Sequence, residues 1–183
     1  MEELDDLRQR LLSDRPDEWE RLPDLALYMD QLISYMPRQL IRFDESDTLT
    51  APMVNNYIKD GLLPRADGKR YGRVHLAYLT AICAMKTVLS VKEMGTLMRS
   101  SSANRDPESL YRWFLDRLDS SLTQAAHALD GEPESPGEDD LAELALSLAL
   151  DSYASKLACQ RILALISQKP PEDEPEKEQK KKK

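Results

Sequence analysis

The chain has 183 residues, of which 41% are hydrophobic and 32% charged, and its formal net charge is −8. This length allows one domain, or a small domain with an appendage, to bury most of its apolar surface without disulfides. The two cysteines, Cys83 and Cys159, lie far apart in apolar helical patterns, and neither belongs to a Cys/His cluster with zinc-ligand spacing. We expect buried reduced thiols, no metal and no cofactor.

The acidic start MEELDD lacks the basic and apolar regions of a secretory signal. The longest uncharged stretch, Val74–Met85, is much shorter than the ~20 residues of a membrane span. We therefore expect a soluble, cytoplasmic protein that does not bind a membrane.

In chain order, the sequence predicts an amphipathic helix over 1–12 and an irregular connector with two prolines over 13–23. A helix is then predicted over 24–36, beginning at Asp24 and ended or kinked by Pro37. Its predicted apolar face consists of residues at helical spacing: Leu25, Tyr28, Met29, Leu32, Ile33 and Met36. A polar loop should follow over 42–49.

The next predicted helix covers 51–60, with Pro52 in its first turn and Gly61 as a left-handed C-cap. Residues 63–65 and 70–72 flank Ala66-Asp67-Gly68-Lys69, which predicts a short β-hairpin. A third helix is expected over 73–89. The capping box Ser90-Val91-Lys92-Glu93 should then begin a fourth helix to about residue 99.

After a predicted loop at 100–106, Asp106-Pro107 should open a helix to about residue 129. An acidic linker over 131–140 and a long helix over 138–167 follow, and 168–183 should be disordered. The apolar residues of the long helix do not keep strict heptad spacing. Its apolar face is nevertheless broad, so we expect it to pack on the preceding helix, on the 24–99 region or on a second subunit.

This order of elements is typical of a winged helix-turn-helix of the MerR type, so we expect a mainly α fold with a short β-hairpin wing and additional C-terminal helices. Four segments resemble the DUF1836 family, a bacterial family of uncharacterised function associated with MerR-like winged helices: PDLALYMDQLISYM (23–36), LTAPMVNNYIKDGLLP (49–64), GKRYGRVHLAYL (68–79) and MKTVLSVKEM (85–94). The resemblance covers about residues 20–130. Taken with the predicted elements, the chain divides into four regions: an N-terminal helical or irregular extension at 1–23, a MerR-like winged-helix domain at 24–99, a helical dimerisation or effector region at 100–167 and a charged tail at 168–183.

Charge patterning places the candidate DNA contacts in this winged-helix region. Residues 37–99 carry ten Lys/Arg against six Asp/Glu, whereas 1–36 carry four against ten and 100–140 three against ten. Because salt screens charges beyond about 8–10 Å, a local basic face can bind phosphates while the rest of the chain is acidic. The predicted DNA-binding residues are Asn55, Asn56, Lys59, Lys69, Arg70, Tyr71 and Arg73.

Each of these residues also has a structural interpretation. An asparagine in the recognition helix can pair with adenine in the major groove, but Asn55 and Asn56 point about 100° apart, so at most one can be central. Lys59 could contact a DNA phosphate, or it could be an ordinary solvent-exposed lysine. Basic residues at a hairpin tip can hold the phosphate backbone or enter the minor groove. Tyr71 more often packs such a wing onto the core.

We do not expect an enzyme. His75 and His127 have no partner at ligand or catalytic spacing, and no phosphate-binding glycine motif is present. A set of methionines could line the pocket of an unknown small-molecule effector, although filling the core is the simpler interpretation: Met29, Met36, Met85, Met94 and Met98.

The sequence therefore favours a transcriptional regulator that binds double-stranded DNA, with a homodimer and a small-molecule or protein effector as further possible partners. The alternative is a winged-helix protein-interaction or adapter module that does not bind DNA. The acidic pI of about 4.9 supports it. So do Asn55 and Asn56, which stand where MerR recognition helices usually carry Arg and Tyr.

Overall fold

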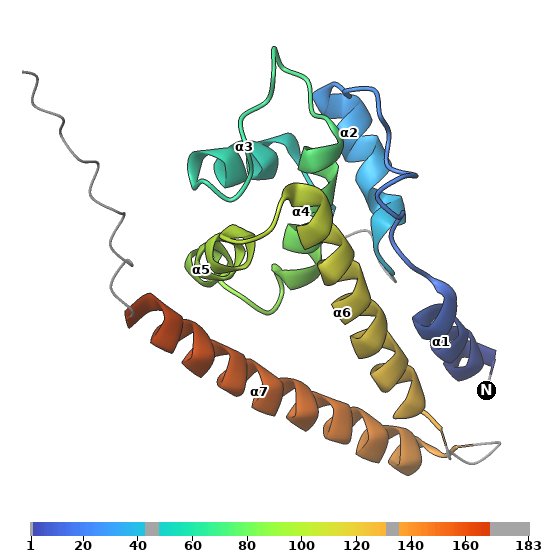
Figure 1. The fold of residues 1–183 in the computed structure, drawn as a ribbon. Helices are drawn as coiled ribbons and strands as arrows, with labels where there is room; N and C mark the ends of the chain where they lie inside the picture. Colours follow the sequence, from blue (N-terminus) through green and yellow to red (C-terminus); the bar gives the residue numbers. More distant parts are fainter. Residues whose placement is uncertain (1, 43–47, 131–135, 169–183) are drawn as a thin grey trace, which may run out of the picture.

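The computed structural model describes residues 2–42, 48–130 and 136–168 (Figure 1). In these ranges the fold is mainly helical, as predicted. The elements are α1 (Glu2–Ser13), α2 (Met29–Tyr35), a 3-10 helix η1 (Met36–Gln39), α3 (Ala51–Lys59), α4 (Arg73–Met85), α5 (Val91–Ser102), α6 (Pro107–His127) and α7 (Glu138–Gln168). No helix among the described residues combines the length and apolarity that crossing a membrane requires.

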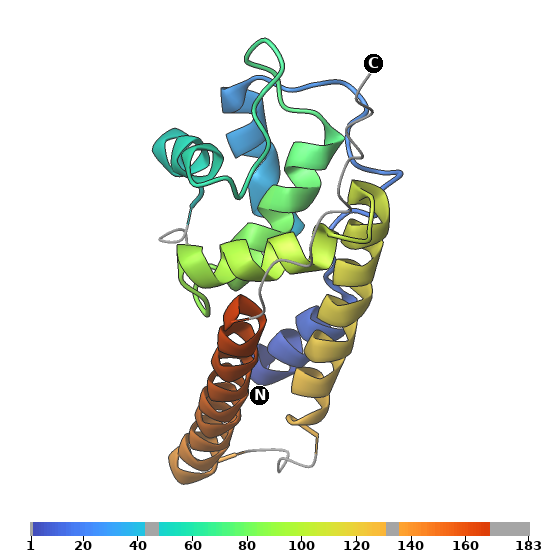
Figure 2. The ribbon, with the colours of Figure 1, turned by 60° about the vertical axis from the view of Figure 1, so that its left-hand side comes forward.

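The helices form a compact group at one end and an open arrangement at the other. Helices α2, α3 and α4 gather at one end, with α5 beside them, and the loop between α3 and α4 projects from that end in both views (Figures 1 and 2). Helix α6 runs from α4 and α5 towards the opposite end, where α1 packs along it. Helix α7 returns from there, and its main contact is with α5.

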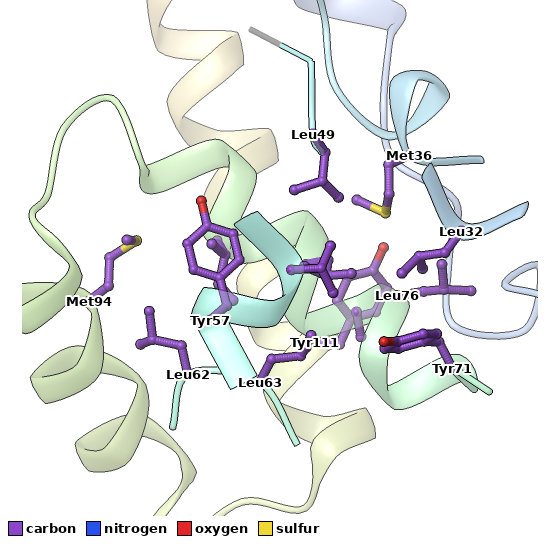
Figure 3. Packing of buried hydrophobic residues seen from close by; sticks show 14 of the residues in the cluster. Leu32, Met36, Leu49, Tyr57, Leu62, Leu63, Tyr71, Leu76, Met94 and Tyr111 are labelled. Atoms are coloured by element: carbon purple, nitrogen blue, oxygen red, sulfur yellow. The ribbon is translucent and has the colours of Figure 1, made fainter. Parts of the chain in front are cut away.

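One hydrophobic core joins the helices from α2 to α6 (Figure 3). Helices α2, α3 and α4 each contribute fully buried side chains, represented by Leu32, Val54 and Leu76. The connector before α2 adds Leu22, and α6 adds Tyr111. Because apolar burial provides about 25 cal/mol per Å², these shared contacts hold α3 and the following loop in a fixed position.

Two predicted helix starts are confirmed with their caps. Ser90 Oγ accepts a hydrogen bond from the Glu93 N–H at 3.3 Å, and the Glu93 carboxylate accepts one from the Ser90 N–H at 2.8 Å. At α6, the Asp106 carboxylate accepts hydrogen bonds from the N–H groups of Glu108 and Ser109, both at 3.1 Å. Such caps satisfy N–H groups that have no partner within the helix.

The boundaries of three predicted helices were wrong. Helix α2 begins at Met29 instead of Asp24, because Leu27 is extended and exchanges backbone hydrogen bonds of 2.9 and 2.8 Å with Tyr71. Helix α4 ends at Met85, four residues early, in a turn that buries Leu89. Helix α5 continues into the predicted loop and ends at Ser102. No glycine or proline occurs at residues 100–106 to end it earlier.

The predicted β-hairpin wing does not form as two strands in the described residues. The backbone N–H groups of Leu62 and Leu63 bind the Tyr57 carbonyl at 2.8 and 3.1 Å, which closes the end of α3. Pro64 has no N–H to donate. The segment 63–65 therefore cannot supply a ladder, and the only pairing across the turn is between Asp67 and Arg70.

Three predicted segments lie wholly or partly outside the described residues. They are the polar loop at 42–49, of which 43–47 are not described, the acidic linker at 131–140, of which 131–135 are not described, and the tail at 168–183, of which only Gln168 is described.

Candidate nucleic-acid interface

Helix α3 turns one polar face to solvent. Val54 and Tyr57 are 0% and 6% exposed and fix the inner side of the helix. Asn55, Asn56 and Lys59 are all exposed and, at 3.6 residues per turn, lie within about 100° of one another. Gly61, at φ +72°, then ends the helix in the left-handed conformation that the sequence predicted.

The loop after α3 contains a tight turn with Gly68 and Lys69 at its centre. Their φ angles are +51° and +70°, and the Asp67 and Arg70 backbones exchange hydrogen bonds of 3.1 and 2.8 Å. Two central residues with positive φ are typical of a type I′ turn, which favours Asn or Gly at both positions. A lysine in this conformation is strained by roughly 1–2 kcal/mol. Lys69 is exposed, and no hydrogen bond or ion pair to it is found in the described part of the chain.

His75 holds the base of this loop. Its Nδ1 accepts a hydrogen bond from the Gly72 N–H at 3.0 Å, and its Nε2 lies 3.2 Å from the Arg65 carbonyl oxygen. The neutral tautomer with hydrogen on Nε2 satisfies both contacts. The ring also stands edge-on to Tyr71, with centroids 5.4 Å apart. His75 thus has a structural role in the described fold.

Three of the predicted contact residues are engaged within the protein. Tyr71 is 5% exposed and belongs to the core. This agrees with the interpretation that Tyr71 packs the loop onto the core. The Arg70 guanidinium lies 5.0 Å from the ring centroid of Tyr28 and donates a hydrogen bond of 3.0 Å to its hydroxyl. Arg73 is half-buried and bound to the connector before α2.

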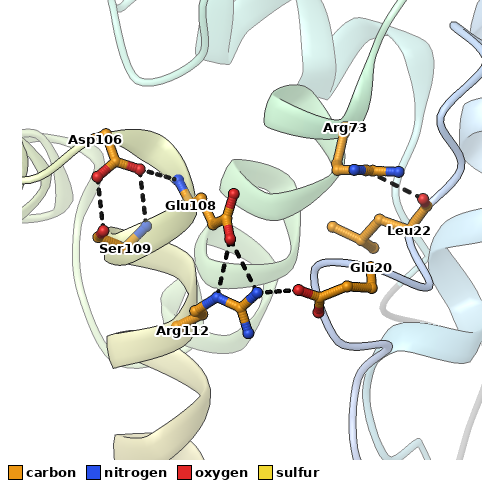
Figure 4. A network of polar contacts seen from close by, with 7 residues as sticks. All are labelled: Glu20, Leu22, Arg73, Asp106, Glu108, Ser109 and Arg112. Atoms are coloured by element: carbon orange, nitrogen blue, oxygen red, sulfur yellow. Dashed lines mark hydrogen bonds and ion pairs between the residues drawn. The ribbon is translucent and has the colours of Figure 1, made fainter.

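Arg73 donates a hydrogen bond of 3.2 Å from Nε to the Leu22 carbonyl (Figure 4). Its guanidinium lies 5.7 Å from the ring centroid of Trp19. The same connector is tied to α6 because Arg112 pairs with both Glu20 and Glu108. Backbone hydrogen bonding and Arg112 lower the pKa of Glu20, so this carboxylate stays charged beside Arg73 and offsets part of its positive field.

The most accessible part of the candidate surface is therefore formed by α3 and the turn tip. Lys59, Lys69 and Arg70 are its exposed predicted cations, although Arg70 also contacts Tyr28. Arg65, which was not among the predicted contact residues, is also exposed and lies between Lys59 and Lys69 in the chain. The cluster PRADGKR contained that signal. Tyr28 and Trp19 were missed as partners of Arg70 and Arg73, because sequence gives no measure of contacts across 42 or more positions.

The methionines mainly fill the core. Met36, Met94 and Met98 are buried, and Met29 and Met85 pack against the core cluster. A separate open pocket of about 380 Å³ lies between η1, α4 and α6. Met36, Cys83 and Leu118 are in its lining, but the other four methionines are not.

Comparison with known proteins identifies a family. The family model described as "Domain of unknown function (DUF1836)" matches residues 17–114. No curated protein and no solved structure matches the chain. The matched range begins in the connector before α2, includes all the predicted site residues and ends within α6, so that α1 and α7 lie outside it. Since this range is more than half of the chain, the protein belongs to the DUF1836 family.

Proposed function

We propose that this protein is a transcriptional regulator of MerR-like winged-helix type that binds double-stranded DNA. Helix α3 would enter the major groove, where Asn55 or Asn56 would read adenine through its N6 and N7. Lys59 and Lys69 would neutralise phosphates, and the loop between α3 and α4 would take the place of a wing. Arg70 and Arg73 would act mainly by holding that loop.

The conformation of Lys69 is the observation that carries this proposal. A type I′ turn is most stable with glycine or asparagine at this position, yet the chain places a long cation there at φ +70°. Residues in strained backbone conformations of this kind cluster at functional sites. The turn also lies at the end of the molecule remote from acidic α1 (Figure 1), so its charge faces solvent.

A Lys69→Gly variant should separate stability from binding. Glycine relieves the left-handed strain, so thermal stability should be unchanged or slightly higher. The lost phosphate contact should lower the salt slope of log K by about 0.9, and Lys59→Ala/Lys69→Gly should lower it by about twice as much. Fluorescence anisotropy on a pool of genomic duplex fragments, over a salt series beginning at ~50 mM, measures both quantities.

The matched control is Arg117→Glu, which reverses an exposed charge on α6. It should leave DNA affinity within about twofold, whereas Lys69→Glu should weaken it at least about tenfold. Absence of binding by the wild-type protein at ~50 mM salt would contradict the proposal. Equal losses in Lys69→Glu and Arg117→Glu would contradict the placement of the surface.

One observation favours the alternative function, a protein-interaction module. The guanidinium groups of Arg70 and Arg73 already contact the rings of Tyr28 and Trp19. Helix α3 and the turn tip therefore have fewer cations available to a partner than the sequence suggested. An acidic partner peptide would need only Lys59, Arg65 and Lys69. Failure to bind duplex DNA, together with selective binding of an acidic peptide, would support this adapter.

A further inference from the structure

Helix α7 carries a large apolar surface that the described part of its own chain leaves uncovered. Among the described residues its main neighbour is α5, which it meets near its C-terminal end. There Leu163 is 4% exposed, Cys159 and Ile166 pack against the core, and Gln160 Nε2 donates a hydrogen bond of 2.9 Å to Glu93. The preceding five turns extend away from the core (Figures 1 and 2).

The exposed apolar residues of this part form a regular stripe. Leu146, Leu150, Tyr153 and Leu157 are 60%, 57%, 62% and 49% exposed. They are spaced by four, three and four residues, as in a coiled-coil seam. At 3.6 residues per turn they lie within about 60° of one another, and the centre of the stripe is about 145° from the side formed by Cys159, Leu163 and Ile166. The stripe thus faces away from the side of α7 that packs on α5.

Charged residues mark the two ends of this stripe. Glu143 lies one turn before Leu146 and Arg161 lies one turn after Leu157, on the same face. In an antiparallel pair of such helices, Leu146 meets Leu157 and Leu150 meets Tyr153. The same register brings Glu143 of each copy beside Arg161 of the other. A parallel pair would instead oppose Glu143 to Glu143 and Arg161 to Arg161.

We propose that the α7 stripe is a self-complementary interface that pairs antiparallel with α7 of a second copy of this chain. The pattern is isologous, because each copy offers the same surface and the same two charges. Four half-exposed large side chains correspond to an apolar patch of roughly 300–400 Å², which is comparable to the largest patch of a typical monomer, and such patches are often functional. Two such patches with their polar flanks approach the ~1,000 Å² of a specific but reversible interface.

Leu150→Glu tests the interface, because the twofold axis places two carboxylates at its centre. Sedimentation equilibrium between about 1 and 100 µM should show a wild-type dimer, and the variant should raise the dimer Kd by at least about 100-fold. Ile162→Glu is the matched control. Leu150 and Ile162 are both 57% exposed, but Ile162 lies about 150° from the centre of the stripe, so its variant should dimerise normally. Circular dichroism should show unchanged helix content in both.

Charge reversal tests the orientation. Glu143→Lys alone and Arg161→Glu alone each place like charges together in an antiparallel pair, so each should raise the Kd about fivefold. The double variant restores opposite charges and should recover wild-type affinity, which a parallel pair cannot do. A monomer at ~100 µM would overturn the proposal, as would equal losses in Leu150→Glu and Ile162→Glu, or a double variant that fails to recover.

Discussion

Leu32→Ala is expected to lower the free energy of unfolding by about 3–5 kcal/mol. Leu32 is 0% exposed and lies in the core between α2 and its neighbours (Figure 3). Truncation removes buried methyl groups and leaves a cavity, because close-packed surroundings collapse only partially. Urea denaturation followed by circular dichroism measures the change, and the denaturant slope should stay at its wild-type value.

Leu25→Ala is the matched control. The sequence placed Leu25 and Leu32 on one helical face, but Leu25 is 77% exposed in the non-helical segment before α2. Its truncation should change stability by less than about 0.5 kcal/mol. Similar losses in the two variants would show that Leu25 is packed and that α2 begins earlier than Met29.

Asp17→Ala is expected to lower the free energy of unfolding by about 2–4 kcal/mol. One carboxylate oxygen of Asp17 accepts hydrogen bonds from the Tyr35 hydroxyl at 2.5 Å and from Gln39 Nε2 at 2.9 Å. Gln39 is 0% exposed, and its Oε1 has no partner among the described residues. Removing the carboxylate therefore leaves two largely buried donors unsatisfied. Thermal and urea unfolding both report the loss.

Asp17→Asn provides the control, since its amide oxygen can accept from both donors without carrying a charge. It should cost less than half of the alanine loss. Burial and the contact with Asp17 raise the pKa of Tyr35, so the neutral hydroxyl is the donor through the physiological pH range. Equal losses in the alanine and asparagine variants would show that charge, and not hydrogen bonding, holds this contact.

The sequence predicted the local features of this fold well. The caps at Ser90, Asp106 and Gly61 depend on residues within four positions of each other, and all three form as expected. The failures came from distant contacts. Leu27 is extended because Tyr71, 44 positions later, supplies its backbone partner. The first wing strand is absent because the N–H groups of Leu62 and Leu63 bind the Tyr57 carbonyl at the end of α3 and are not available to a strand partner.

The sequence predicted which residues of the candidate site are exposed better than it predicted their side-chain contacts. The exposure of Asn55, Asn56, Lys59 and Lys69 follows from helical spacing and from the glycine turn, which are local. The engagement of Arg70 and Arg73 depends on a connector that packs beside them from more than 40 positions away. Sequence spacing carries no information about such contacts, so it overestimated the number of cations available to a partner.

Among the described residues α7 is attached at only one end, which makes it a lever arm. A helix of 31 residues is about 46 Å long, and here its C-terminal turns alone rest on α5. A tilt of about 10° at that contact would displace the far end by several ångströms, because the displacement grows with distance along a stiff helix. Helix α5 also packs beside the loop after α3, where a Cβ added to Gly95 would lie 3.7 Å from a methyl group of Leu62. Small movements near the candidate surface would therefore be magnified at the distal end of α7, which in the proposed dimer would set the distance between two copies.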